Sequence, residues 1–283
     1  MTPSSAEPPR AKRIAPQDWP DRSVPGAIFL GLDLAWSPKN PSGLAALDEG
    51  GTVLDLRCET SDADILAWVR ERARATTVLG IDMPTIVKNA SGARVCEAEV
   101  RARFARHHAG PHPANLGLAT FRDGGRARRL LDHLAADGFA DRPRLTARQP
   151  GHHALEVFPH PAHVRLFERA TIFKYKKKSG REWPDVWAAW ADYRASLASL
   201  GDADPPLRLP ASVPHHVRGL KSAAYKGWDD LLDALTCAYV AAFAWRYGTS
   251  GPEVRVFGDA DGGYIVVPDK PPLRRAPSAR RDA

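Results

Sequence analysis

Aspartates end or interrupt three apolar segments that lie far apart in this chain, and these residues have the clearest chemical potential. Asp33 and Asp82 each close a short apolar run, whereas Asp230 and Asp233 occur within a long apolar stretch, residues 228–245. A carboxylate at the end of a buried strand costs stability unless a cation meets it. We therefore expect these four aspartates to converge on one cation site.

The type of side chain indicates which cation to expect. Carboxylates are ligands that Mg²⁺ and Mn²⁺ prefer in proteins. If the strands that end in Asp33 and Asp82 are parallel neighbours, about 4.8 Å apart, both carboxylates can reach the same ion. Asp230 and Asp233 are three residues apart in the sequence, which places them on one face of a helix. Two ions roughly 4 Å apart would activate water and stabilise the leaving oxygen of a phosphodiester, so we expect metal-dependent hydrolysis.

Each aspartate also has a simpler interpretation when it is taken alone. An aspartate at the end of a strand often caps a helix or forms a turn. Asp229 and Asp230 would also stabilise the first turn of a helix through its dipole. Asp233 does not fit this interpretation, because it lies inside an apolar helix, where an unpaired charge is costly. The combination is therefore more informative than its parts.

Glu156 and His160 belong to one further segment with polar groups near a predicted strand. Glu156 alternates with apolar neighbours in residues 154–159 and is a candidate catalytic residue. It could be a third metal ligand, an acceptor that orients a water or a base, or the salt-bridge partner of an arginine, and the sequence leaves these roles open. His160 could assist proton transfer to the leaving group. The ten histidines match no zinc spacing, so we expect no zinc site.

Basic residues suited to phosphate binding occur in three places. In residues 173–181, lysines surround a tyrosine that could stack on a base, although a solvated loop would have the same composition. Two arginines share a predicted helix face after residue 93, and two lysines precede the acidic helix. The predicted substrate-binding residues are Lys174, Tyr175, Lys176, Arg94, Arg101, Lys221 and Lys226.

The elements that must position these residues can be predicted from apolar periodicity. Strands at residues 28–35, 44–47 and 53–57 form an antiparallel meander, and a helix capped by Ser61 or Asp62 leads to a strand at 78–81. A fifth strand is expected at 154–159, with helices at 162–169, 183–200 and 228–245 and a final hairpin at 254–257 and 264–267. This order predicts an α/β protein with a mixed five-stranded sheet flanked by helices.

Composition indicates one domain with basic character. We expect a domain at residues 26–267 with an Arg-rich helical insertion at about 84–153, between disordered tails at 1–25 and 268–283. The net charge of +7 favours a polyanionic partner such as nucleic acid, although a GC-biased genome would also enrich arginine. No apolar run is long enough to span a membrane, and no secretory signal is evident. The three cysteines lack metal-ligand spacing, so we expect reduced thiols in a cytoplasmic protein.

The order of these motifs resembles a known nuclease fold. An aspartate on the first strand, another on the fourth, and Asp-x-x-Asp-Ala on the last helix are similar to the ribonuclease H-like fold, and residues 230–235 resemble its Holliday-junction resolvase branch. Residues 31–35, 81–84, 94–97, 156–161 and 226–230 more closely resemble the family catalogued as domain of unknown function 429, regarded as predicted nucleases of this fold. The similarity extends over roughly residues 28–247 and implies metal-dependent nuclease chemistry without a substrate.

Three functions remain as hypotheses at this stage. The first is a nuclease that uses two Mg²⁺ or Mn²⁺ ions held by Asp33, Asp82, Asp230 and Asp233. The second is a non-catalytic nucleic-acid-binding module of the same fold, which has no need for carboxylates facing a phosphate backbone. The third is a phosphotransferase of the actin-like fold, disfavoured because Leu-Ala-Trp rather than glycine follows Asp33. The choice between DNA and RNA, the mode of cleavage and the oligomeric state stay open.

Overall fold

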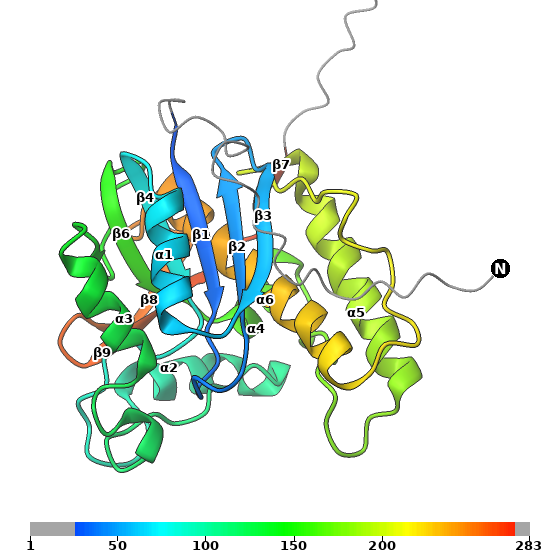
Figure 1. Ribbon diagram of the computed structural model, residues 1–283, viewed down its shortest axis with the longest axis horizontal. Helices are drawn as coiled ribbons and strands as arrows, with labels where there is room; N and C mark the ends of the chain where they lie inside the picture. The colour runs from blue at the N-terminus through cyan, green and yellow to red at the C-terminus, as the bar shows by residue number, and fades with distance from the viewer. Residues whose placement is uncertain (1–25, 275–283) are drawn as a thin grey trace, which may run out of the picture.

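A mixed sheet of six strands forms the centre of the structure (Figure 1). The computed structural model describes residues 26–274 of the 283-residue chain. Across the sheet the strands are β3 (Val53–Glu59), β2 (Ser42–Asp48), β1 (Ile28–Asp33), β4 (Thr76–Ile81), β6 (Gly151–Glu156) and β5 (Ala140–Asp141). The first three are antiparallel, and β4, β6 and β5 run parallel to β1. The predicted mixed α/β sheet is confirmed, but the two-residue strand β5 makes it six-stranded rather than five-stranded.

Helices cover both faces of this sheet. On one face lie α1 (Asp62–Arg72) and α3 (Arg126–Ala135), whose apolar residues pack on β1 and β4. On the other face lies α6 (Ser222–Tyr247), with α5 (Trp183–Ala198) packed outside it. β1 is buried on both faces because both layers cover it, which explains its nearly continuous apolar sequence. Ser61 caps α1, as predicted, by accepting a hydrogen bond from the Asp64 N–H at 3.3 Å.

Three glycines allow α6 to lie directly against the sheet. A Cβ atom on Gly31 of β1 would be 2.0 Å from the carbonyl oxygen of Ala234, and one on Gly80 of β4 would be 2.4 Å from that of Cys237. A Cβ atom on Gly43 of β2 would be 2.2 Å from the carbonyl oxygen of Asp230. Side chains at these positions would force the helix away from the strands. The close approach therefore brings the aspartates of α6 next to the end of β1.

The segment between β4 and β6 is part of the core as well as an insertion. It contains α2 (Val95–Phe104), the 3₁₀ helices η2 (Ala105–His107) and η3 (Ala119–Phe121), then α3 and β5. α2 packs against the predicted terminal hairpin, which is confirmed as β8 (Val254–Asp259) and β9 (Gly263–Pro268). α4 (Pro159–Leu166) follows β6 directly. The insertion thus shares one apolar core with the sheet and another with the hairpin.

Several predicted boundaries need correction. α6 begins at Ser222, six residues before the predicted start at Trp228, because its first six residues, Ser-Ala-Ala-Tyr-Lys-Gly, hold no run of large apolar side chains. Residues 268–274 were expected in a tail, yet β10 (Leu273–Arg274) pairs with β7 (Ala203–Asp204), which follows the 3₁₀ helix η4 (Ser199–Asp202). The expected tails at 1–25 and 275–283 lie outside the described residues. Over the part of the chain that is described, no helix is both long and apolar enough to cross a membrane.

Candidate functional site

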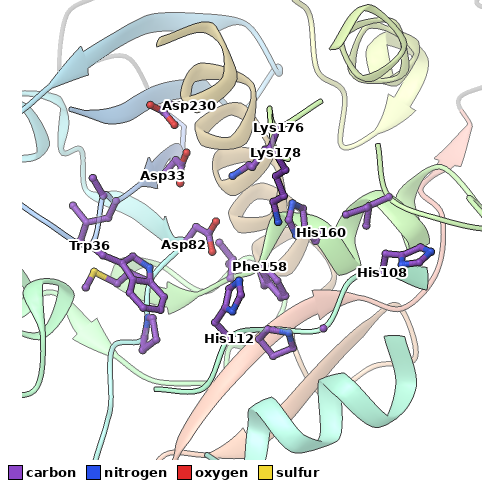
Figure 2. Close-up of a pocket in the computed structure, with 18 of the residues that line it drawn as sticks. Asp33, Trp36, Asp82, His108, His112, Phe158, His160, Lys176, Lys178 and Asp230 are labelled. Carbon is purple, nitrogen blue, oxygen red and sulfur yellow. The ribbon is translucent and has the colours of Figure 1, made fainter. Parts of the chain in front are cut away.

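A cavity of about 1400 Å³ opens at the carboxyl ends of the parallel strands (Figure 2). Asp33 is the last residue of β1, Asp82 follows β4 and Glu156 ends β6, and all three line the cavity. Asp230 reaches the same cavity from α6. Parallel strands present their carboxyl ends at one edge of a sheet, which is where ligands bind in open α/β sheets. The structure therefore brings together four acidic residues from three strands and a helix.

Asp33 and Asp82 are neighbours across two strands. Leu32 pairs with Ile81, and the Asp82 N–H donates to the Leu32 carbonyl oxygen at 2.8 Å, so the next residues of both strands stand side by side. Burial raises the pKa of the Asp33 carboxyl. Burial, followed by the negative charge of Asp33, raises the pKa of Asp82 well above its usual value. Two half-buried carboxylates in adjacent positions therefore favour a cation between them.

Asp230 and Asp229 add buried acceptors that lack donors. Both residues are 3% exposed. Among residues 26–274, no group donates a hydrogen bond to Asp230 Oδ2 or Asp229 Oδ1. Lys226, one turn earlier on α6, pairs with Asp230 and lies 3.7 Å from Asp229. Burial raises the pKa of Asp229 to about 6. Of these two residues Asp230 lines the cavity, and its orphaned Oδ2 is what an added cation would satisfy.

Asp233 has a different environment from the other aspartates. It is fully buried behind the cavity, where Tyr175 and Tyr193 donate hydrogen bonds to its Oδ1 at 2.5 and 3.2 Å. The Lys176 ammonium lies 2.7 Å from its Oδ2. Burial alone would raise the pKa of Asp233, but the nearby positive charges, Lys176 foremost, lower it. Asp233 is therefore the ion-pair partner of Lys176 in this structure, and its predicted role as a metal ligand stays a prediction.

Lys176 is the cation that faces the acidic residues. Its side chain is 28% exposed and lines the cavity. Burial would lower the pKa of Lys176, but the surrounding carboxylates, Asp233 first, raise it well above the usual value. In Figure 2, Asp33 and Asp82 lie between Lys176 on one side and Trp36 on the other. Lys176 is therefore a fixed positive charge beside the candidate cation site.

The acidic residues share a cavity without forming a closed ligand set. Within the described part of the chain, no three His, Cys, Asp or Glu side chains already converge as a metal-binding group. Lys226 and Lys176 supply the nearest positive charges to Asp230 and Asp233. Binding of an ion by all three would thus require side-chain movements of Asp33, Asp82 and Asp230.

Glu156 is the salt-bridge partner of an arginine from the insertion, one of the three roles left open above. Arg94 Nη2 lies 2.5 Å from Glu156 Oε1, and Arg94 Nη1 donates to Oε2 at 2.8 Å. The Thr85 N–H also donates to Oε2, at 2.9 Å. Both oxygens are occupied, so the salt-bridge role is the one seen in the structure, and the catalytic role of Glu156 stays a prediction. The pairing of β4 with β6 agrees with this. Glu156 lies beside Ile81, so its side chain points to the opposite face of the sheet from that of Asp82, the next residue.

The predicted substrate-binding residues divide into two groups. Arg94 is 2% exposed and held by Glu97 and Glu156, and Tyr175 is fully buried, so neither is available to a substrate. Lys221 is exposed at the start of α6, outside the lining of the cavity. Arg94 lines the cavity while held by these two glutamates, and the other predicted residues that line it are Lys174, Lys176, Arg101 and Lys226. Tyr175 is buried because it pairs with Asp233, a partner that local sequence does not reveal.

Sequence reasoning missed several residues around the site. Trp36, Lys178 and Arg181 line the cavity. Lys178 and Arg181 belong to the basic segment 173–181 described above but were not named as site residues, and the only signal for Trp36 was its position three residues after Asp33. His163 is fully buried, and neither of its ring nitrogens has a hydrogen-bond partner among the described residues. His160 lines the cavity, but burial lowers its pKa to about 3. It is therefore neutral at pH 7 and cannot protonate a leaving group as an imidazolium.

The fold and the site define an α/β protein with an acidic cavity at the carboxyl ends of its parallel strands. The family described as "protein of unknown function (DUF429)" matches residues 31–259, which include all of the acidic residues discussed above. The chain belongs to this family. No curated protein and no solved structure matched the chain.

Proposed function

We propose that this protein is a metal-dependent phosphodiesterase that hydrolyses nucleic acid and has a ribonuclease H-like fold. The observation that carries the proposal is the convergence of Asp33, Asp82 and Asp230 at one cavity, from β1, β4 and the last helix. An antiparallel meander followed by parallel strands and a final helix on the first strand supports the fold assignment. The net charge of +7 supports a polyanionic substrate.

The donor set fits a Mg²⁺ or Mn²⁺ ion. Asp33 and Asp82 are half-buried neighbours with raised pKa values, and Asp230 Oδ2 has no donor among the described residues. Hard divalent ions prefer such carboxylate oxygens together with water and phosphate. A bound ion would supply Lewis-acid polarisation of the phosphate and make a nearby water more acidic. The role of the three carboxylates is to hold the ion at the carboxyl edge of the sheet.

The environment of Asp233 favours one ion in place of the two predicted from the sequence. Lys176, held by Asp233 at 2.7 Å, already faces Asp33 and Asp82. A second divalent ion beside this ammonium would be repelled by it. Lys176 is placed to contact a non-bridging phosphate oxygen and so to neutralise the charge that develops during cleavage. One ion and one lysine would then stabilise the negative charge that two ions stabilise in a two-metal mechanism.

A cleavage assay tests this proposal. Single-stranded, duplex, hybrid and branched substrates are incubated with the protein and Mn²⁺, with EDTA as the metal-free control. The Asp33→Asn variant should lose at least about 100-fold in rate, the scale of removing a principal electrostatic contribution. Asp192→Asn, an exposed aspartate on α5 outside the cavity, should cleave like wild type. Wild-type cleavage by Asp33→Asn would refute the metal-ligand assignment.

A non-catalytic nucleic-acid-binding module is the second candidate function. The observation in its favour is that Lys176 and Lys226 already pair with Asp233 and Asp230 without a metal. This alternative predicts binding that weakens as salt increases, with no cleavage of any substrate in Mn²⁺. The same substrate panel therefore separates the two candidates.

A further inference from the structure

Trp36 presents an aromatic ring to the cavity three residues after Asp33. It is 42% exposed, whereas most other tryptophans of the described chain are buried or half-buried. Its ring packs edge-on against Phe121 of η3, with ring centroids 5.1 Å apart and planes at 70°. Phe121 is fully buried, so it fixes Trp36 in place. A large apolar ring held at a cavity without a cover costs free energy and suits a ligand with a flat apolar face.

The backbone next to Trp36 is also fixed. Arg126 is fully buried and its Nη1 donates to the carbonyl oxygen of Ala35 at 2.9 Å. The same guanidinium donates to the carbonyl oxygen of Thr60 at 2.8 Å and lies 2.6 Å from Asp62. Arg126 therefore ties the backbone at Ala35, between Asp33 and Trp36, to Thr60 and Asp62. The distance from the acidic edge to the aromatic ring is therefore set by the fold.

Cations form the opposite wall of the cavity. Lys174, Lys178 and Arg181 line it, from the segment that follows α4. Arg181 donates to the carbonyl oxygen of Lys176 at 2.8 Å, which shapes this segment. Lys174 and Lys178 are exposed and have no ion-pair partner within residues 26–274. Figure 2 shows Lys178 and Trp36 on opposite sides of Asp33 and Asp82. Free ammonium groups facing an aromatic ring are a combination that binds the phosphates and bases of one strand.

We propose that the cavity binds an unpaired nucleic-acid strand, with a base stacked on Trp36 and the adjoining phosphates on Lys174 and Lys178. This inference rests on the proposed function, because the bound strand places a phosphodiester between these contacts and over Asp33 and Asp82. The volume of about 1400 Å³ exceeds the roughly 300–1,000 Å³ typical of small-molecule sites and suits a segment of polymer. The inference names the substrate class that the catalytic residues alone leave open.

Stacking on Trp36 decides between paired and unpaired substrates. In the interior of a duplex, both faces of every base are covered by neighbouring base pairs, so an indole has no face to contact. An unpaired base can leave its neighbours and stack on an aromatic side chain, a contact worth about 1–3 kcal/mol per base. Trp36 therefore contributes to affinity for a single strand and contributes nothing to affinity for a continuous duplex.

Competition binding in the uncleaving Asp33→Asn protein tests the inference. A fluorescent oligothymidylate is the probe, with circular single-stranded DNA and relaxed circular duplex DNA as competitors at equal phosphate concentration, so that neither competitor has ends. The single strand should compete at least about 10-fold better than the duplex. Adding Trp36→Ala should weaken oligothymidylate binding about 5-fold or more, and Trp36→Phe should retain most of the affinity. Leu273→Ala, an exposed apolar residue outside the cavity, is the matched control and should change nothing.

The outcomes distinguish this inference from the proposed function. Unchanged oligothymidylate affinity in the Trp36→Ala protein, or equal competition by the duplex, would overturn the inference. If wild type then cleaves duplex DNA with Mn²⁺ and Trp36→Ala cleaves it at the same rate, the nuclease assignment stands without the unpaired-strand substrate. If neither DNA form binds and no substrate is cleaved, both proposals fail together.

Discussion

Neighbouring side chains, more than residue type, separate the acidic groups of this protein into different roles. Asp33, Asp82 and Asp230 line the cavity, whereas Glu156 forms an ion pair with Arg94 and Asp233 forms one with Lys176. The sequence identified all five as candidates because each is an acid next to apolar residues. It could not tell them apart, since the partners of Glu156 and Asp233 are 62 and about 58 residues away along the chain.

His163 gives a prediction about pH at the residue scale. It is fully buried against aromatic rings, with its ring centroid 4.2 Å from that of Tyr193, and burial lowers its pKa well below the usual 6.5. Below pH 6.5 the unfolded chain binds a proton that folded His163 does not, so stability falls as pH decreases. Because neither ring nitrogen has a hydrogen-bond partner among the described residues, His163→Phe should preserve packing and remove this dependence.

Urea denaturation at a series of pH values checks this expectation. Between pH 6.5 and 5, wild type should lose about 2 kcal/mol more unfolding free energy than His163→Phe, at roughly 1.4 kcal/mol per pH unit. His160 remains in both proteins and contributes equally to both curves. Parallel curves for the two proteins would show that His163 is protonated in the folded state.

At the scale of elements, the contact between α6 and the sheet positions the site. Glycines on β1, β2 and β4 remove the side chains that would separate α6 from the strands. Gly31 is two residues before Asp33, so both lie on the face that α6 covers. The distance between Asp230 and Asp33 therefore depends on the absence of a side chain at Gly31.

A single methyl group at Gly31 should disturb both stability and chemistry. In Gly31→Ala, the new Cβ would lie 2.0 Å from the Ala234 carbonyl oxygen and 2.4 Å from the Ala238 backbone nitrogen. The helix must shift, which should cost about 3 kcal/mol of unfolding free energy. Cleavage by the fraction that remains folded should also fall, because Asp230 moves away from Asp33. Gly201→Ala is the control, since its nearest atom is 3.9 Å away and its change should stay within about 0.5 kcal/mol. Equal stability of the two variants would contradict the close packing.

Most of the elements could be predicted from sequence because they carry periodic apolar residues. The meander, the crossover helix α1, the parallel strands β4 and β6 and the terminal hairpin all have this pattern. The two-residue strands β5, β7 and β10 are too short to produce a period of any kind. The first turns of α6 consist of small or polar residues apart from Tyr225, so the predicted helix began only where its run of large apolar residues does.

At the scale of the whole molecule, the basic excess does not come from a substrate-binding insertion. Two arginines of the insertion tie it to the rest of the domain, through Arg94 with Glu156 and Arg126 with Asp62, and Arg128 pairs with Asp141 inside the insertion. The insertion still serves the site, because Phe121 supports Trp36 and residues 108–112 contribute to the cavity wall. The cations that face the acidic edge come mainly from the segment after α4. The net charge predicted a polyanionic partner, but only the fold identifies which lysines and arginines line the cavity without an ion-pair partner among the described residues.

Calorimetric titration of the full-length protein with Mn²⁺ tests the central claim most directly, because it measures the ion without requiring a substrate. The account predicts one Mn²⁺ bound per chain, held by Asp33, Asp82 and Asp230, and loss of at least about 10-fold in affinity, or about 1.4 kcal/mol, for Asp33→Asn. Asp192→Asn should bind Mn²⁺ like wild type. Absence of Mn²⁺ binding in wild type, or equal binding by Asp33→Asn, would contradict the claim that these carboxylates form a metal site.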